Sequence, residues 1–289
     1  MKALVVAAYG KRYEVELDDK RRISCVTRGK KTDLACGDIV EIALTDSAQG
    51  VVESSAARTS LLYRSSAFKS KILAANVTQV VIVLATQPSF YEALLNRCLV
   101  AAEAANIKPL IVLNKCDLAD VSDAKSKLQL YEELGYSVIH LAAKQVITPL
   151  LAHLDNHQSV LVGQSGMGKS TIINALLPEQ QVRTQEVSDA LDSGKHTTTA
   201  AHLYQLNAHS SLIDSPGLQE FGLNHLTNEQ VELAFREFRP FLGHCKYNDC
   251  KHGHEPECAV ISALKSGKIS AVRLDFYRQL SQALTCTAN

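Results

Sequence analysis

Hydrophobic and polar residues alternate along residues 1–60 in the manner of short β-strands. In "RYEVEL", Tyr13, Val15 and Leu17 fall on one face and charged residues on the other. The segments "ALVVAAY", "RISCVT" and "DIVEIAL" also indicate strands, with Gly and Asp turns between them. No helical periodicity is evident here. Several short strands in about 60 residues predict a small β-barrel, and a five-stranded OB-type barrel fits this length.

From about residue 70 the pattern changes to strands that alternate with helices. The run "QVVIVLAT" is continuously apolar, as in a parallel strand buried on both faces. The segment "SFYEALLNRCLVAAEAAN" has helical spacing, with one apolar stripe formed by Leu94, Leu95, Cys98, Leu99 and Ala102. A strand "KPLIVLN", a helix "DAKSKLQLYEELG" and a strand "YSVIHLAAK" follow. This alternation predicts a doubly wound α/β sheet, whose ligands bind at the carboxyl ends of its strands.

A glycine-rich loop lies between a predicted strand and a predicted helix in "SVLVGQSGMGKSTIINALL". It matches the pattern G-x-x-x-x-G-K-[ST] of a phosphate-binding loop, and its flanks supply the required context. Lys169 would contact the β and γ oxygens of a bound nucleotide, and Ser170 would bind Mg²⁺. The predicted nucleotide-binding residues of this loop are Gly163, Gln164, Ser165, Gly166, Met167, Gly168, Lys169, Ser170 and Thr171.

The tetrapeptide "NKCD", Asn114, Lys115, Cys116 and Asp117, directly follows a predicted buried strand. The Asp117 carboxylate would accept two hydrogen bonds from guanine, and adenine offers no such pair of donors. Lys115 would pack along the base, and Asn114 would tie the loop to its neighbours. "AAK" at 142–144 lies where a second guanine-contacting loop would fall. The sequence therefore predicts a guanine-nucleotide site.

Two further segments suit the switches of such a site. Asp214 and Gly217 form a D-x-x-G pattern, in which Asp214 would hold Mg²⁺ through water and the Gly217 N–H would sense the γ-phosphate. A threonine of "SGKHTTTA", with Thr198 as the candidate, would also reach Mg²⁺. Leu218 occupies the position where Ras-like proteins carry a water-orienting Gln, so slow intrinsic hydrolysis is predicted. His196 is the candidate residue for positioning the attacking water.

The order of these segments differs from that of an ordinary G domain, in which the base-reading element follows the phosphate loop. Here residues 114–117 come first, and the phosphate loop at 163–170 and the switches follow. The sequence therefore predicts a circularly permuted G domain. Its original ends would be joined near residues 148–158, which is sterically possible because domain termini often lie close together.

Three of the eight cysteines cluster with histidines in "HCKYNDCKHGHEPEC". The thiolates of Cys245, Cys250 and Cys258 with one imidazole would form a closed tetrahedral set for one structural Zn²⁺. His252 gives the spacing C-x4-C-x-H-x5-C, and His244 and His254 are rivals for the fourth ligand position. Disulfides are the alternative, but three cysteines leave one unpaired. Upstream, Thr227 and Gln230 have the spacing of a helix capping box.

The 30 basic and 30 acidic residues balance, so global charge indicates no partner. Residues 1–31 are locally basic, with nine Lys or Arg against four acids. This stretch is either a solvated face or a footprint for a phosphate backbone. The longest apolar run is too short to span a bilayer, and nothing indicates export, so we expect a cytoplasmic monomer without membrane contact.

Taken together, "GQSGMGKST", "GKHTTT", "DSPG", the permuted order and the Cys/His segment resemble the RsgA (YjeQ) family of small-subunit-dependent GTPases. The resemblance covers nearly the whole chain. It implies binding of the small ribosomal subunit through rRNA, a role in late subunit maturation, His252 as the zinc ligand and His196 as a catalytic residue. Basic residues in the C-terminal helices, Lys265, Lys268, Arg273 and Arg278, modestly support the rRNA contact.

We therefore predict an OB-type barrel over residues 1–62, a circularly permuted G domain over 63–222 and a helical zinc-binding domain over 223–289. The chain would hydrolyse GTP with Mg²⁺ and hold one structural Zn²⁺. A shift at Gly217 on γ-phosphate binding is hypothesised to move the zinc domain. Two alternatives stay open: an RNA-binding adaptor with negligible hydrolysis, which Leu218 admits, and a P-loop ATPase or kinase, in which "NKCD" would be accidental.

Overall fold

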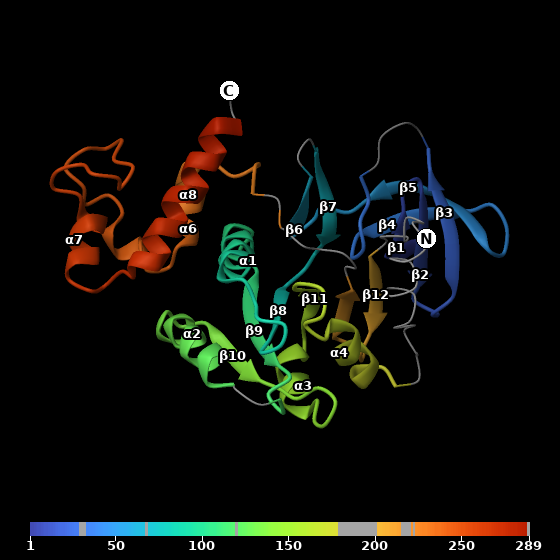
Figure 1. Cartoon of the computed structure of the whole chain (residues 1–289). Helices are drawn as coiled ribbons and strands as arrows, with labels where there is room; N and C mark the ends of the chain where they lie inside the picture. Colours follow the sequence, from blue (N-terminus) through green and yellow to red (C-terminus); the bar gives the residue numbers. More distant parts are fainter. Residues whose placement is uncertain are drawn as a thin grey trace, which may run out of the picture.

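The computed structural model describes residues 1–28, 33–66, 69–118, 121–178, 201–214, 221 and 223–287. A small barrel, an α/β core and a C-terminal helical module follow one another along the chain and lie side by side (Figure 1). Within the described ranges, no helix has both the length and the apolar character needed to cross a membrane.

The N-terminal strands close into the predicted five-stranded barrel. They pair in the order β1-β2-β3-β5-β4, and β4 pairs back onto β1. Tyr13, Val15 and Leu17 are buried on the inner face, as their alternation predicted. The strands are β1 (Lys2–Tyr9), β2 (Arg12–Leu17), β3 (Arg22–Thr27), β4 (Ile39–Leu44) and β5 (Gln49–Ser55).

The core is a six-stranded sheet in the order β10-β9-β8-β11-β13-β12, parallel except for β12. Every residue of β8 is buried, because helices cover both faces of the sheet there. The strands are β8 (Gln79–Ala85), β9 (Lys108–Asn114), β10 (Ser137–His140), β11 (Gln158–Val162), β12 (His202–Gln205) and β13 (Ser211–Asp214). The helices are α1 (Glu92–Ala104), α2 (Ser122–Glu133), α3 (Thr148–Leu154) and α4 (Lys169–Leu176).

The strand order bears out the permuted topology. The phosphate-loop strand β11 is central: strands β8, β9 and β10, which precede it in sequence, lie on one side, and β13 and β12, which follow, lie on the other. The predicted joint at 148–158 contains the short helix α3, which leads from β10 back to the middle of the sheet. The segment in which the original termini are predicted to be joined therefore forms an ordinary helical connection between two strands.

Two connections between barrel and core were not predicted. A two-stranded hairpin, β6 (Leu61–Ser66) and β7 (Lys69–Ala75), lies between the two regions in sequence. In addition, β12 of the core pairs with β1 of the barrel through Ala7 and His202, which makes the two sheets continuous. The Gln158 side chain also donates to the Ala75 carbonyl oxygen over 2.8 Å. Barrel and core are therefore joined by backbone pairing as well as by the chain.

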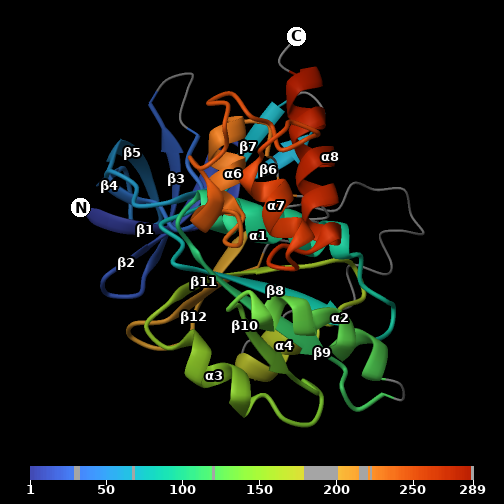
Figure 2. The same ribbon diagram turned by 90° about the vertical axis from the view of Figure 1, so that its left-hand side faces the viewer.

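The C-terminal module packs on the core through α6, which contacts α1 in both views (Figures 1 and 2). The predicted capping box is present: the Gln230 N–H donates to Thr227 Oγ1 and the Thr227 N–H donates to Gln230 Oε1. Phe235, Phe238 and Tyr277 form its aromatic core, with ring centroids 4.9–5.5 Å apart. Its elements are α6 (Asn228–Ala234), a 3₁₀-helix (Arg239–Phe241), α7 (Ala259–Lys265) and α8 (Ala271–Thr287).

Candidate nucleotide site and metal centre

The nucleotide-binding candidates converge at the carboxyl edge of the core sheet. Asn114 ends β9 and pairs with Ala85 at the end of β8. Asp214 ends β13 and pairs with Leu161, next to the phosphate loop that follows β11. Since parallel strands end on one edge, segments far apart in sequence meet there. The two loops on which the sequence prediction depended therefore lie on the same side of the sheet.

A direct link between these loops is made by Asn114, which is only 2% exposed. Its side-chain nitrogen donates to the Met167 carbonyl oxygen of the phosphate loop over 3.0 Å. Its side-chain oxygen accepts from the Ala143 N–H of the predicted second base loop over 3.1 Å. One buried amide thus fixes three loops relative to one another, and all of its hydrogen bonding is to main-chain groups.

The phosphate loop depends on glycine at two close approaches. A Cβ on Gly163 would lie 2.2 Å from the Val83 carbonyl oxygen, and one on Gly168 would lie 2.3 Å from the Asn114 side-chain nitrogen. Both residues have positive φ, 145° and 94°. The loop fits against β8 and β9 only because these positions lack side chains. Ser170 and Thr171 then lie in the first turn of α4, whose N-terminus faces the loop.

Lys169 and Asp214 form the charged centre of the site. The Lys169 ammonium donates to the carbonyl oxygens of Gly163 and Gln164 over 2.6 and 2.8 Å. Burial lowers the pKa of Lys169, and the nearby Asp214 partly offsets this. Burial raises the pKa of Asp214, against the smaller effects of Lys169 and His202. Burial deprives both charged groups of water. Phosphate oxygens would stabilise the Lys169 ammonium and a Mg²⁺ ion would stabilise the Asp214 carboxylate, so these residues fit a metal–nucleotide complex.

The remaining base-reading residues, Lys115, Cys116 and Asp117, lie at least partly exposed at the surface. Lys115 has a positive φ of 63°, and its ammonium donates to the Gln87 carbonyl oxygen over 2.7 Å. The Cys116 N–H donates to the Leu141 carbonyl oxygen over 3.0 Å. Asp117 is exposed, so its carboxylate is accessible to a base. Of the other predicted residues, His196, Thr198, Gly217 and Leu218 lie outside the described ranges.

The C-terminal module brings Cys245, Cys250, His252 and Cys258 together, with ligand atoms all within 4.8 Å of one another. His252 Nδ1 lies 3.7, 3.6 and 3.3 Å from the three sulfurs in that order. A tetrahedral zinc with usual bond lengths would set a sulfur–nitrogen edge of about 3.6 Å and a sulfur–sulfur edge of about 3.8 Å. The Cys245 and Cys258 sulfurs are 3.8 Å apart, far beyond a disulfide bond of about 2.05 Å.

The four residues therefore fit zinc, and His244 and His254 are not in the group. Supporting residues come from the helices around it. Glu232 of α6 places Oε1 3.8 Å from His252 Nε2, a buried nitrogen that has no hydrogen-bond partner among the residues that the structure describes. The Tyr277 hydroxyl donates to the same carboxylate over 2.9 Å. A carboxylate behind the second imidazole nitrogen orients a metal-binding histidine. Sequence reasoning missed Glu232, because only the packing of α6 brings it here.

The structure corrects one reading of the basic residues. The sequence offers Arg273 as support for rRNA contact, but its side chain is 0% exposed and donates to Glu237 and Asn96 over 2.6 and 2.7 Å. Arg278 donates to the carbonyl oxygens of His252 and Gly253, so it buttresses the Cys/His segment. These guanidinium groups pair inside the protein because helix packing buries them, which a count of charges does not reveal.

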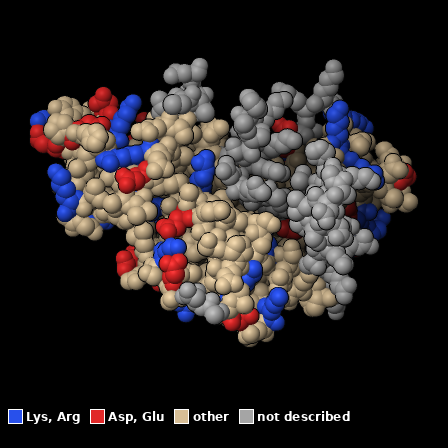
Figure 3. All heavy atoms as spheres, viewed as in Figure 1, with Lys and Arg blue, Asp and Glu red and all other residues tan. Residues whose placement is uncertain are grey.

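On the barrel, part of the local positive charge is also paired. Arg22 lies 3.3 and 3.4 Å from the carboxylates of Glu14 and Glu16, and Lys20 lies 3.0 Å from Glu16. Figure 3 shows Lys and Arg side chains over the barrel and over the helical module, with acidic side chains mixed among them on the module. The barrel surface therefore carries both positive and negative charges. Because some of its basic side chains are paired with carboxylates, it has fewer unpaired positive charges than the number of Lys and Arg residues indicates.

Comparison with known proteins agrees with this geometry. The family model described as RsgA GTPase matches residues 55–224, more than half of the chain. A small ribosomal subunit biogenesis GTPase RsgA of Nitrosospira multiformis is 50% identical over 281 residues, which cover 97% of this chain and 90% of that protein. The protein of the same name from Nitrosomonas europaea is 49% identical over 284 residues, with the same coverage.

Two solved structures have the same architecture. YjeQ from Thermotoga maritima aligns with a TM-score of 0.76 and 29% identity, covering 98% of each chain. YloQ, described as a circularly permuted GTPase, aligns with a TM-score of 0.73 and 26% identity, covering 99% of this chain and 95% of that one. The similarity extends over barrel, core and C-terminal module alike.

Proposed function

The chain belongs to the RsgA family of GTPases, and from this premise we propose that it hydrolyses GTP while bound to the small ribosomal subunit and assists the late maturation of that subunit. The observation that carries the proposal is the buried Asn114 side chain, which joins the base-reading, second base and phosphate loops. Its two hydrogen bonds support a single guanine-nucleotide site built from segments in permuted order.

Each loop has a role in this site. Asp117 reads guanine, and Asn114, Lys115 and Cys116 hold the base loop in place. The main chain of residues 163–171 binds the phosphates through its N–H groups. Lys169 neutralises charge on the β and γ oxygens. The Gly217 N–H contacts the γ-phosphate, and the groups that would hold Mg²⁺ are Ser170, Thr198 and Asp214.

The chemistry is attack of water on the γ-phosphoryl group, to give GDP and phosphate. A bound Mg²⁺ supplies positive charge to the phosphate oxygens. Leu218 has no group that can orient water, so turnover by the protein alone is slow. We assign the positioning of water to His196, and the small subunit accelerates the reaction by bringing the switch that carries His196 into place.

A structural zinc ion completes the C-terminal module. Cys245, Cys250, His252 and Cys258 bind it, and with four protein ligands no position is left for a substrate or water. Zinc therefore stabilises the fold of this module rather than taking part in hydrolysis. Through the barrel and this module the protein contacts rRNA, and because such contacts involve phosphates, binding weakens as salt concentration rises.

The test is phosphate release with purified small subunits titrated into a fixed amount of protein. We expect low basal turnover that rises by tenfold or more at saturation, and loss of this rise in His196→Ala. Turnover that stays at the basal level would favour a nucleotide-responsive RNA-binding adaptor, the alternative that Leu218 admits.

Base recognition is tested separately with Asp117→Asn. An amide in this place offers a donor where guanine also has donors, so preference should move from guanosine to xanthosine nucleotides by about 100-fold or more. Equal displacement of bound GTP by ATP from the unaltered protein would contradict the guanine site and favour a P-loop ATPase.

A further inference from the structure

Helix α1 touches the nucleotide loops at its beginning. The Tyr91 N–H, at the N-cap, donates to Gln164 Oε1 of the phosphate loop over 3.2 Å. Just before it, Pro88 lies against Gly166, where an added Cβ would be 3.4 Å from Pro88 Cδ. The short segment before α1 also accepts the Lys115 ammonium at the Gln87 carbonyl oxygen. The start of α1 is therefore held by both the phosphate loop and the base loop.

The same helix holds the C-terminal module along one face. Asn96 and Glu103 are seven residues apart, which places them on the same side two turns from each other. Asn96 Oδ1 accepts from Arg273 of α8 over 2.7 Å. The Glu103 carboxylate accepts from Arg236 over 2.6 Å and from Arg239 over 2.7 Å. These contacts join the core to the module at two points.

These contacts are well placed to transmit movement. Asn96 is 2% and Arg273 0% exposed, and the Glu103 side chain is 9% exposed. Hydrogen bonds to charged groups are stronger than neutral ones, and the Glu103 carboxylate is shared by two guanidinium groups. A helix of this length is a rod of roughly 20 Å that keeps its ends in fixed relation. A displacement of the phosphate loop at Gln164 would therefore move α1 and shift Glu103 with it.

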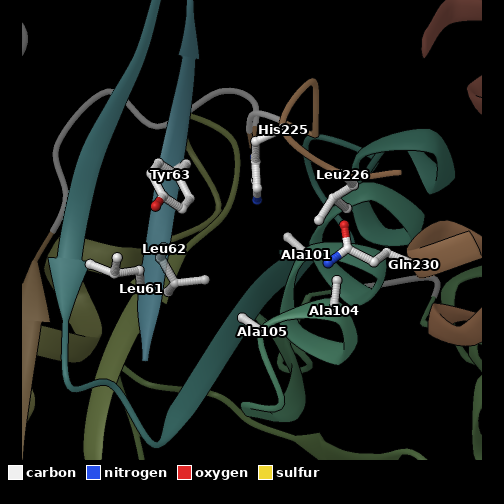
Figure 4. Close-up of a pocket in the computed structure, with 9 residues that line it drawn as sticks. All are labelled: Leu61, Leu62, Tyr63, Ala101, Ala104, Ala105, His225, Leu226 and Gln230. Atoms are coloured by element: carbon white, nitrogen blue, oxygen red, sulfur yellow. The ribbon is translucent and has the colours of Figure 1, made fainter. Parts of the chain in front are cut away.

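The described residues that lead into the module leave a space beside α1. An open cavity of about 190 Å³ lies between strand β6, the end of α1 and the segment His225–Gln230, as Figure 4 shows. On the α1 side it is lined by Ala101, Ala104 and Ala105, whose small side chains leave the space unfilled. Atoms that line a void lack contacts on one side, so these small side chains add little to the packing that α6 itself makes on α1.

We infer that Gln164 is a positioning residue: its side chain ties the phosphate loop to α1, and through Asn96 and Glu103 the docked module holds that loop in its nucleotide-binding shape. The inference rests on the proposed nucleotide site. The module then slows nucleotide release, and by linkage a bound nucleotide strengthens the docking of the module to the same extent. This route runs through the helix, and differs from the hypothesised one through Gly217.

A double-mutant cycle on the full chain tests the inference. Dissociation of a fluorescent GDP is timed for the unaltered protein, Gln164→Ala, Glu103→Gln and the double variant. Each single change should speed release about three- to tenfold, and the double variant should be no faster than the faster single one, because both break one path. Gln129→Ala and Glu133→Gln remove a matched pair on the exposed face of α2 and should leave the rate unchanged.

Effects that multiply in the double variant, or a Glu103→Gln rate equal to that of the unaltered protein, would overturn the coupling. A reciprocal measurement guards against a folding defect in Glu103→Gln. GDP should slow amide hydrogen exchange in α8 of the unaltered protein, and this protection should be lost in Gln164→Ala. If the unaltered protein binds no guanine nucleotide, the site itself fails; if it binds one and exchange in α8 does not change, only the coupling fails.

Discussion

In the α/β core the functional groups stand at the ends of buried strands, whereas in the C-terminal module four side chains meet in a segment with almost no regular structure. The core loops are shaped by main-chain contacts, such as the approach of Gly163 to Val83, that exist without any ligand. In the Cys/His group the four side chains that meet are the ones that would bind the ion, and few main-chain hydrogen bonds surround them. Burial raises the pKa of the Cys250 thiol, which disfavours the thiolate that a metal ion would bind.

This difference indicates what each region needs in order to fold. The sheet and its main-chain contacts shape the proposed nucleotide site, and we expect this shape to form without a ligand. If the Cys/His group holds zinc as proposed, we expect the module to depend on the ion, because metal-binding free energy in a small site of this kind is also folding free energy. A change in the first region should therefore affect function more than stability, and a change in the second should do the reverse.

The largest effect is expected from Cys250→Ser. Loss of one thiolate should abolish zinc binding and loosen the segment around residues 244–258, because the few remaining contacts, such as that of Arg278, replace only part of the metal-binding free energy. Zinc content by a colorimetric chelator and limited proteolysis of the module measure this. His252→Ala should behave in the same way, while His254→Ala should retain zinc. Zinc retained by His252→Ala and lost by His254→Ala would reverse the ligand assignment.

Gly168→Ala should have the next largest effect. The new methyl group would lie 2.3 Å from the Asn114 side-chain nitrogen, at a φ of 94° that disfavours any side chain. Displacement of Asn114 breaks the link between the loops, so GDP affinity should fall more than tenfold by titration. Gly10→Ala is the control, because it has a φ of 71° with nothing within 4 Å. It should lower stability by about 1 kcal/mol and leave GDP affinity unchanged.

The smallest effect concerns Asp214→Asn in the nucleotide-free protein. The folded-state pKa of Asp214 is raised, so the ionised carboxylate opposes folding once the pH exceeds the unfolded pKa of about 3.9. Removal of the charge should raise the unfolding temperature at pH 7 by up to a few degrees. This gain should shrink as the pH is lowered toward 4. A lower unfolding temperature at pH 7 would contradict the sign, and Mg²⁺-dependent GTP binding should be weakened in the same variant.

Local signals were sufficient for much of the fold and of the nucleotide loops. The alternation of apolar and polar residues predicted the barrel strands. Continuous apolar runs predicted β8 and β9, because strands buried on both faces carry few polar residues. Capping chemistry gave the start of α6 at Thr227. The loops could be found because glycines and a lysine at fixed spacing are needed to bind a phosphate, whatever the order of the surrounding elements.

Features that depend on packing between distant segments could not be found in this way. The sequence of the hairpin of β6 and β7 has no clear alternation, and β12 has only four residues, one of which pairs with the barrel. In the sequence, a buried arginine such as Arg273 cannot be told from an exposed one. Only the packing of the helices shows that it is bound by Glu237 and Asn96. The same is true of Glu232 behind His252.

The pairing of Ala7 with His202 has a practical consequence. A shortened chain without the barrel would leave β12 as a bare outer strand, with unsatisfied N–H and C=O groups open to a second molecule. Such a fragment should self-associate through its exposed strand edges, so the α/β core is best produced together with the N-terminal barrel.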